Sequence, residues 1–113
     1  LNIKIIEIIC RKYFKIDTEI IRQSDIDVEG EKSELILNIC KNLNAKNYLS
    51  GPGGEDYLNE SAFEKHKIDI TYLKNTFPQE YSQLHPKLGF INNISALDFI
   101  FNVGNDWERY YTL

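Results

Sequence analysis

The 113-residue sequence has no methionine, only two cysteines and no long apolar run. Two cysteines cannot form the disulfide framework of a small secreted domain, and Cys10 and Cys40 lack the spacing of metal ligands. Both lie in apolar helical patterns, so we interpret them as buried thiols in a reducing compartment. No stretch approaches the roughly 20 apolar residues of a membrane span, and no signal-peptide pattern opens the sequence. We therefore expect a cytoplasmic protein without a membrane span.

An excess of basic residues is also absent, because 13 Lys and Arg stand against 17 Asp and Glu, for a net charge of −4. That balance argues against a nucleic-acid partner, which requires a concentrated basic face. Hydrophobic residues make up 42% and charged residues 27%, as in an ordinary folded domain. The sequence begins at Leu1, inside an apolar helical pattern and without methionine, which predicts a fragment of a longer polypeptide. We expect residues 1–113 to form a single domain or a C-terminal half-domain.

Apolar periodicity predicts alternating helices and strands along the chain. Helical spacing is found over residues 1–14, 31–43, 60–66 and 95–103, and β-rich runs over 18–22, 47–50 and 68–73. The many isoleucines of the first segment leave a strand open as an alternative there. The last helix is apolar on nearly every side, so we expect it to be buried. This order predicts an α/β fold, a three-layer βαβαβ unit with a short parallel sheet.

Ligands of parallel sheets bind beyond the carboxyl ends of the strands, which directs attention to the glycine-rich stretch after the second predicted strand. The candidate binding residues there are Ser50, Gly51, Pro52, Gly53 and Gly54. Glycines let backbone N–H groups approach a phosphate or carboxylate, and a following helix would add a favourable dipole. The stretch lacks the Lys-Ser/Thr pair of a Walker loop, so a plain tight turn is the alternative.

Two further groups of candidates lie in and after the long segment 75–93. Tyr81, Gln83 and His85 carry polar tips that could bind a sugar, although a lone histidine is more often structural. Asn93, Ser95 and Asp98 could bind a ligand at a helix start. Ser95 and Asp98 also have the spacing of a helix cap, which explains them without a ligand. No His, Cys or Asp cluster has metal-ligand spacing, so we predict no metal site.

Three motifs resemble the WbqC-like protein family of bacterial O-antigen and surface-polysaccharide genes. They are YLSGPGGEDYL over residues 48–58, YSQLH over 81–85 and GFINNISALDFIFNVG over 89–104, in the family's order and spacing. Ser82 and Asn92 replace prolines of the family pattern, and Val103 stands where the family has cysteine. Any role of that cysteine is therefore absent here. Family members are about twice this length, and the resemblance implies that an N-terminal half of the same protein is missing.

The resemblance implies a transferase of O-antigen or surface-polysaccharide biosynthesis that attaches glycine or another amino acid to an amino sugar. The family is also distantly similar to nucleotidylyltransferase or Rossmann-like folds, and by that analogy ATP would activate the carboxylate. The expected partners are a nucleotide-sugar or amino-sugar substrate and the missing half, with the three groups of candidate residues contributing to a shared cleft. The residues leave the catalytic groups unassigned. The alternative is a non-catalytic carbohydrate or nucleotide-sugar binding module of the assembly machinery.

Overall fold

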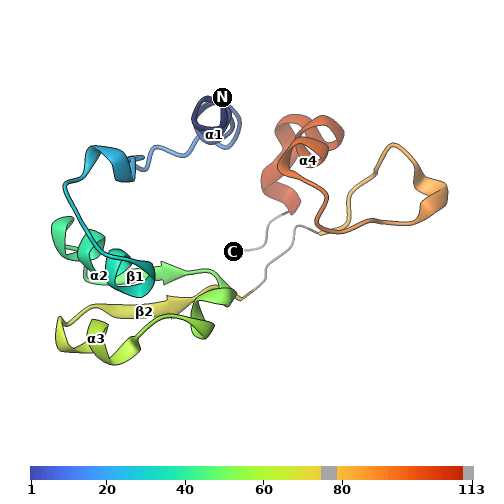
Figure 1. The fold of residues 1–113 in the computed structure, drawn as a ribbon. Helices are drawn as coiled ribbons and strands as arrows, with labels where there is room; N and C mark the ends of the chain where they lie inside the picture. The colour runs from blue at the N-terminus through green and yellow to red at the C-terminus, as the bar shows by residue number, and fades with distance from the viewer. Residues whose placement is uncertain (75–78, 111–113) are drawn as a thin grey trace. The chain divides into compact units, whose positions relative to one another are not determined.

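The computed structural model describes residues 1–74 and 79–110, and it divides the chain into two compact units. One unit is the continuous segment Ile20–Thr76. The other combines Leu1–Glu19 with Phe77–Leu113. We call them the central unit and the terminal unit (Figure 1).

The central unit contains a short parallel sheet of two strands, β1 (Asn47–Ser50) and β2 (Asp69–Tyr72). Asn47 lies opposite Asp69, and Ser50 lies opposite Tyr72, so the two strands end at the same edge of the sheet. The backbone N–H of Leu73 donates to the carbonyl of Ser50 at 2.8 Å and extends the pairing by one residue. The predicted strands at 47–50 and 68–73 are confirmed to within one residue.

Helices α2 (Lys32–Asn42) and α3 (Glu60–Lys65) cover one face of this sheet (Figure 1). Asn59 is the N-cap of α3, because its side chain accepts from the backbone N–H of Ala62. The apolar stripe of α2 packs with Phe63 of α3, which has no exposed surface, and with Ile68. The remaining buried members of this core are Leu37, Cys40 and Leu58.

The opposite face of the sheet is exposed, because alternate strand residues point to opposite faces. Tyr48, Ile70 and Tyr72 pack against the core, whereas Leu49 and Thr71 are exposed. Parallel sheets usually carry helices on both faces. The chain is therefore confirmed as a small α/β fold with a short parallel sheet, and within the central unit that sheet carries helices on one face, so the third layer expected from the sequence is not found among the described residues of this unit.

The predicted strand at 18–22 is also wrong. These residues form no strand, and a short helical turn, η2 (Gln23–Asp25), follows them. The run Thr-Glu-Ile-Ile-Arg has β-propensity, but a strand is stable only when it pairs with a neighbour. Ile20 and Ile21 each keep more than 40% of their surface exposed, so the packing that would fix this segment as a strand is lacking.

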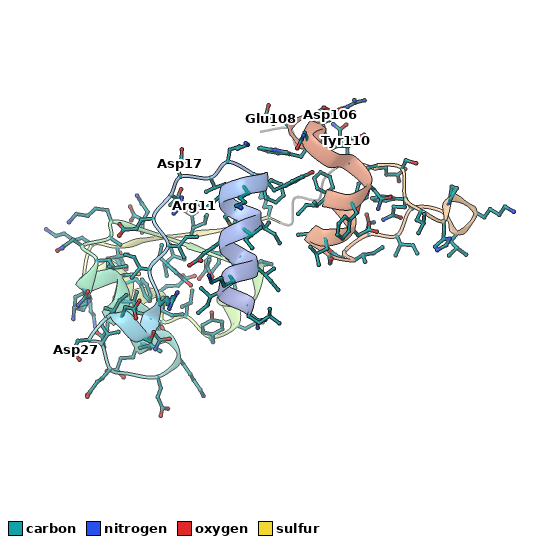
Figure 2. The ribbon with its side chains drawn as sticks, turned by 90° about the horizontal axis from the view of Figure 1, so that it is seen from above. Arg11, Asp17, Asp27, Asp106, Glu108 and Tyr110 are labelled. Atoms are coloured by element: carbon teal, nitrogen blue, oxygen red, sulfur yellow. The ribbon has the colours of Figure 1, made fainter. Side chains whose placement is uncertain are left out.

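The terminal unit begins with α1 (Asn2–Ile8), which continues as the π-helical turn η1 (Ile9–Tyr13), so the helical alternative for this segment is confirmed. It also holds η4 (Pro86–Leu88), α4 (Ala96–Val103) and η5 (Gly104–Tyr110). The Tyr13 hydroxyl donates to the carbonyl of Gly104, and the rings of Phe14 and Trp107 meet edge to face at 5.1 Å. These contacts join the C-terminal end of η1 and the following Phe14 to η5, which carries Asp106, Glu108 and Tyr110 (Figure 2).

Helix α4 is less buried than its sequence predicts. Phe99 is buried, but Phe101 keeps 83% of its surface exposed and Leu97 keeps 47%. Cys40 is a buried free thiol as expected, whereas Cys10 is only half-buried. In the described parts of the chain, none of the helices has the length and apolar character needed to cross a membrane.

Candidate functional site

The side chains of Tyr81, Gln83 and Asp98 form one hydrogen-bonded cluster in the terminal unit. The Tyr81 hydroxyl donates to Asp98 Oδ2 at 2.7 Å, and Gln83 Nε2 donates to the same oxygen at 3.2 Å. Asn102, one turn further along α4, donates to Asp98 Oδ1 at 3.1 Å. All three members of the cluster are half-buried, so the carboxylate is held in place by donors from both the loop and the helix.

Gln83 fixes the loop that carries the cluster. Its Nε2 donates to the carbonyl of Ile91 at 2.9 Å, and its Oε1 accepts from the backbone N–H of Ile91, also at 2.9 Å. This pair of bonds closes the segment between residues 83 and 91 in the way that a strand partner would. The loop is therefore held by a side chain, which explains how a segment without strands keeps a defined shape.

Aromatic packing supports the other side of the cluster. The Tyr81 ring meets the rings of Phe90 and Phe99 edge to face, each at 5.1 Å, and the Tyr110 ring lies 5.9 Å from Phe99. Such arrangements are favourable because ring edges are positive and ring faces negative. The Tyr81 ring therefore anchors the loop on Phe90 and Phe99, while its hydroxyl is directed to Asp98.

A pocket of about 80 Å³ opens beside the cluster. Gln83, His85 and Asp98 supply its polar groups. Its wall is otherwise formed mostly by apolar side chains, Leu84, Leu88, Ile91 and Ile94. Among the described residues, neither Lys nor Arg lines the pocket, and Asp98 supplies a carboxylate to its wall. Such a lining favours a ligand group that is small and carries a hydrogen-bond donor or a positive charge.

Asn93 and Ser95 have local structural roles in the same unit. Ser95 caps α4, and its Oγ accepts from the backbone N–H groups of Leu97 at 3.0 Å and Asp98 at 3.4 Å. Asn93 has a φ of +58°, a left-handed conformation that asparagine tolerates well. Ser95 therefore confirms the predicted cap, but the Asp98 side chain binds Tyr81 and Gln83, 15 to 17 residues away in sequence.

The glycine-rich stretch lies in the central unit, at the end of β1. Gly54 is buried, and a Cβ added there would lie 2.0 Å from the buried Oγ of Ser50, so packing requires this glycine. At Gly51 and Gly53 a Cβ would meet nothing within 4 Å, and neither has a positive φ. Neither conformation nor packing within the chain explains these two glycines.

The helix expected to follow this stretch is a short 3₁₀ turn, η3 (Pro52–Asp56), with Glu55 in its first turn. The expected favourable helix dipole for an anion is therefore absent, because the dipole requires a longer α-helix. Burial raises the pKa of the Tyr48 phenol on β1, and the neighbouring Tyr57 raises that pKa further, while a hydrogen bond with Ser50 opposes both effects.

The predicted site residues thus fall into two sets. Tyr81, Gln83, His85 and Asp98 come together around the pocket, with Asn93 and Ser95 shaping the backbone nearby, whereas residues 50–54 belong to the other unit. The apolar wall was not predicted from the sequence, although four aliphatic residues within the segment 84–94 were a signal for it. Among residues 1–74 and 79–110, no three His, Cys, Asp or Glu side chains gather as metal ligands.

The fold and pocket define a small α/β protein with a candidate binding site built on a loop and a helix start. The sequence matches the WbqC-like protein family over residues 1–110, and the chain belongs to that family. It is 32% identical over 110 residues to the uncharacterized protein Rv1507c of Mycobacterium tuberculosis. That match covers 97% of this chain but 46% of Rv1507c, so the chain spans about half the length of this curated relative. No solved structure matches the sequence.

Proposed function

We propose that this chain is the substrate-binding part of a WbqC-like transferase that attaches an amino acid, such as glycine, to an amino sugar during bacterial surface-polysaccharide biosynthesis. The observation that carries the proposal is the Asp98 carboxylate, held by Tyr81 and Gln83 beside a pocket whose described lining includes neither Lys nor Arg. A carboxylate held in this position binds an amine more favourably than a phosphate or a carboxylate, because an amine donates hydrogen bonds and carries a positive charge. The family's association with surface polysaccharides supplies the sugar context.

The volume of the pocket supports a small ligand group. An engineered protein cavity of about 150 Å³ holds one benzene molecule, so a pocket of about 80 Å³ holds a few non-hydrogen atoms. The amino group and its carbon fit this space, while the rest of a sugar ring would lie outside. Gln83 holds the loop at this pocket, and the exposed His85 at the same pocket would bind a neighbouring hydroxyl group.

The chemistry proposed for the whole protein is the formation of an amide. The amino-acid carboxylate attacks the α-phosphorus of ATP and displaces pyrophosphate, and the sugar amine then attacks the acyl carbon and displaces AMP, with loss of one proton. The open positions at Gly51 and Gly53 support backbone contact between residues 50–54 and one of these substrates. An N-terminal half of the same polypeptide, acting in the bacterial cytoplasm, would supply the reacting groups that this chain leaves unassigned.

The binding step is tested with two sugars that differ at one position. UDP-glucosamine carries an amine where UDP-glucose carries a hydroxyl, so calorimetric titration of the whole protein with both isolates the amine. We expect UDP-glucosamine to bind roughly 10- to 100-fold more tightly, because a charge-assisted hydrogen bond contributes about 1.5–3 kcal/mol. The preference should disappear in Asp98→Asn. Equal affinities in the unsubstituted protein would contradict the proposed role of Asp98.

The transfer step is tested by ATP–pyrophosphate exchange on the same protein with glycine and other amino acids. Exchange that depends on an amino acid supports carboxylate activation. Selective binding of the amino sugar without exchange would leave the second candidate, a non-catalytic nucleotide-sugar binding module. One observation favours that candidate. Three side-chain donors already hold the Asp98 carboxylate in place, as expected for a binding site that is formed before its ligand arrives.

A further inference from the structure

The outer edge of β2 presents backbone groups that the sheet does not use. The N–H groups of Asp69 and Leu73 donate to the carbonyls of Lys46 and Ser50 at 2.9 and 2.8 Å, so the odd-numbered residues of this segment face β1. In a parallel ladder the intervening residues point the other way. The N–H and C=O groups of Ile70 and Tyr72 are therefore directed to the edge away from β1, where the described residues supply no further strand.

A groove of about 490 Å³ runs along this edge, between β2 and α3. Glu60, Glu64 and Lys67 line one side, and residues 68–70 and Tyr72 line the other, while β1 contributes nothing. The volume lies within the roughly 300–1,000 Å³ typical of ligand clefts. An open strand edge beside a helix is the geometry in which proteins bind an extended polypeptide as an added strand.

The groove is closed at one end and acidic along its length. The Tyr72 hydroxyl donates to Glu60 Oε1 at 2.8 Å and ties the end of β2 to the start of α3. Glu60, Glu64 and Asp69 stand against Lys67, so three negative charges and one positive charge leave a formal charge of −2 on the lining. The apolar floor is Ile68, which is buried, and the half-buried Ile70.

We infer that this groove binds an extended segment of the same protein from outside these 113 residues, which adds a third strand to the sheet beside β2 and places a Lys or Arg against Glu64. The matched region is 46% of the length of Rv1507c, so relatives have ample sequence to supply such a strand. A sheet of three or more strands is also far more stable than a pair. The inference rests on the proposed function in one respect, that the chain works as part of a longer protein.

Charge argues against a second copy as the occupant. In a two-fold dimer the same surface meets itself, so Glu60, Glu64 and Asp69 of one copy would face the same three side chains of the other. Like charges across an interface are unfavourable. A basic strand instead complements the groove.

Amide hydrogen exchange tests the inference, and the strand contains its own control. In the 113-residue chain we expect the amides of Ile70 and Tyr72 to exchange at least tenfold faster than those of Asp69 and Leu73. In the whole protein the amides of Ile70 and Tyr72 should slow to the rates of their neighbours. Fast exchange at Ile70 and Tyr72 in the whole protein would overturn the inference, whatever the sugar-binding and pyrophosphate-exchange assays report.

A charge substitution tests the basic side chain. In the whole protein, Glu64→Lys should speed exchange at Ile70 and Tyr72 at least tenfold, because it removes the charge complementarity. Glu34→Lys on the exposed surface of α2 is the matched control and should leave these rates unchanged. Protection that increases with protein concentration would instead identify a second copy as the occupant. Equal effects of both substitutions would also contradict the proposed pairing.

Discussion

Asp98 is the residue at which a local interpretation and the folded structure differ most. Its position three residues after Ser95 predicts a helix cap, yet its carboxylate accepts from Tyr81, Gln83 and Asn102. A carboxylate that serves three donors is both a structural anchor and the charged wall of the pocket. Its two roles can be separated by measuring stability apart from binding.

We predict that Asp98→Ala lowers the free energy of unfolding by about 1–3 kcal/mol, because the Tyr81 hydroxyl and the Gln83 amide lose their acceptor. Asp106→Ala is the control, since Asp106 pairs with Arg109 at 3.8 Å on an exposed surface and such pairs contribute about 0–1 kcal/mol. Urea unfolding followed by the fluorescence of Trp107 measures both, because this single tryptophan belongs to the same unit. Equal losses in the two variants would contradict the proposed network.

The glycines of residues 51–54 offer a second test at single positions. Gly54→Ala should destabilise the central unit by about 1–3 kcal/mol, as overpacking does, because the new methyl group would collide with Ser50 Oγ. Gly53→Ala should leave thermal stability unchanged, since its Cβ meets open space. If residues 50–54 contact substrate, Gly53→Ala weakens nucleotide-sugar binding at unchanged stability. Unchanged binding would identify the stretch as a plain turn.

At the scale of elements, the contact between α3 and β2 depends on the protonation of Tyr72. Burial, the hydrogen bond to Glu60 and the nearby charges of Glu60 and Glu55 raise the pKa of Tyr72 to about 12, from its ordinary value of 10. Since the folded state holds the proton more tightly than the unfolded chain, Tyr72 contributes its stabilisation fully below pH 10. That contribution is lost as the pH rises from about 10 to 12.

We therefore predict that the stability of the central unit declines more steeply between pH 10 and 12 in the unsubstituted chain than in Tyr72→Phe. Thermal melting by circular dichroism at several pH values measures the decline, and the tyrosinate absorbance of the variant should lack an ionisation step near pH 12. Tyr57→Phe, at an exposed position on the same unit, is the control. Identical pH profiles for the unsubstituted chain and Tyr72→Phe would contradict the assignment.

The elements also show which parts of the structure can be predicted from local sequence patterns. Helices α2 and α3 and the cap Ser95 are predicted closely because each depends on side chains within a few residues. The strand at 18–22 fails because a strand needs a partner that local sequence does not specify. The same reason hides the cluster of Tyr81, Gln83 and Asp98, whose bonds span 15 to 17 residues. Candidate residues could be proposed from the sequence, but their partners could not.

At the scale of the whole molecule, the main feature is the small number of buried apolar side chains. Only Leu37, Cys40, Leu58, Phe63, Ile68 and Phe99 are buried among the apolar side chains of the described residues. Helix α1 has no buried residue, and its Ile6 and Ile8 each keep 52% of their surface exposed. Exposed aliphatic surface of this kind favours association, because burying it lowers the free energy by roughly 25 cal/mol for each Å² removed from water.

We predict that the 113-residue chain self-associates at micromolar concentration or melts with a broad, low-temperature transition. Sedimentation velocity over a concentration series measures the first property, and calorimetry measures the second. Ile6→Gln combined with Ile8→Gln should reduce association without lowering stability, because neither side chain is buried. Lys4→Gln combined with Lys12→Gln, on the same helical segment, is the control for a change that leaves the apolar surface intact. A monodisperse monomer with a sharp melting transition would contradict this prediction. It would show that Ile6 and Ile8 of α1 are covered in solution.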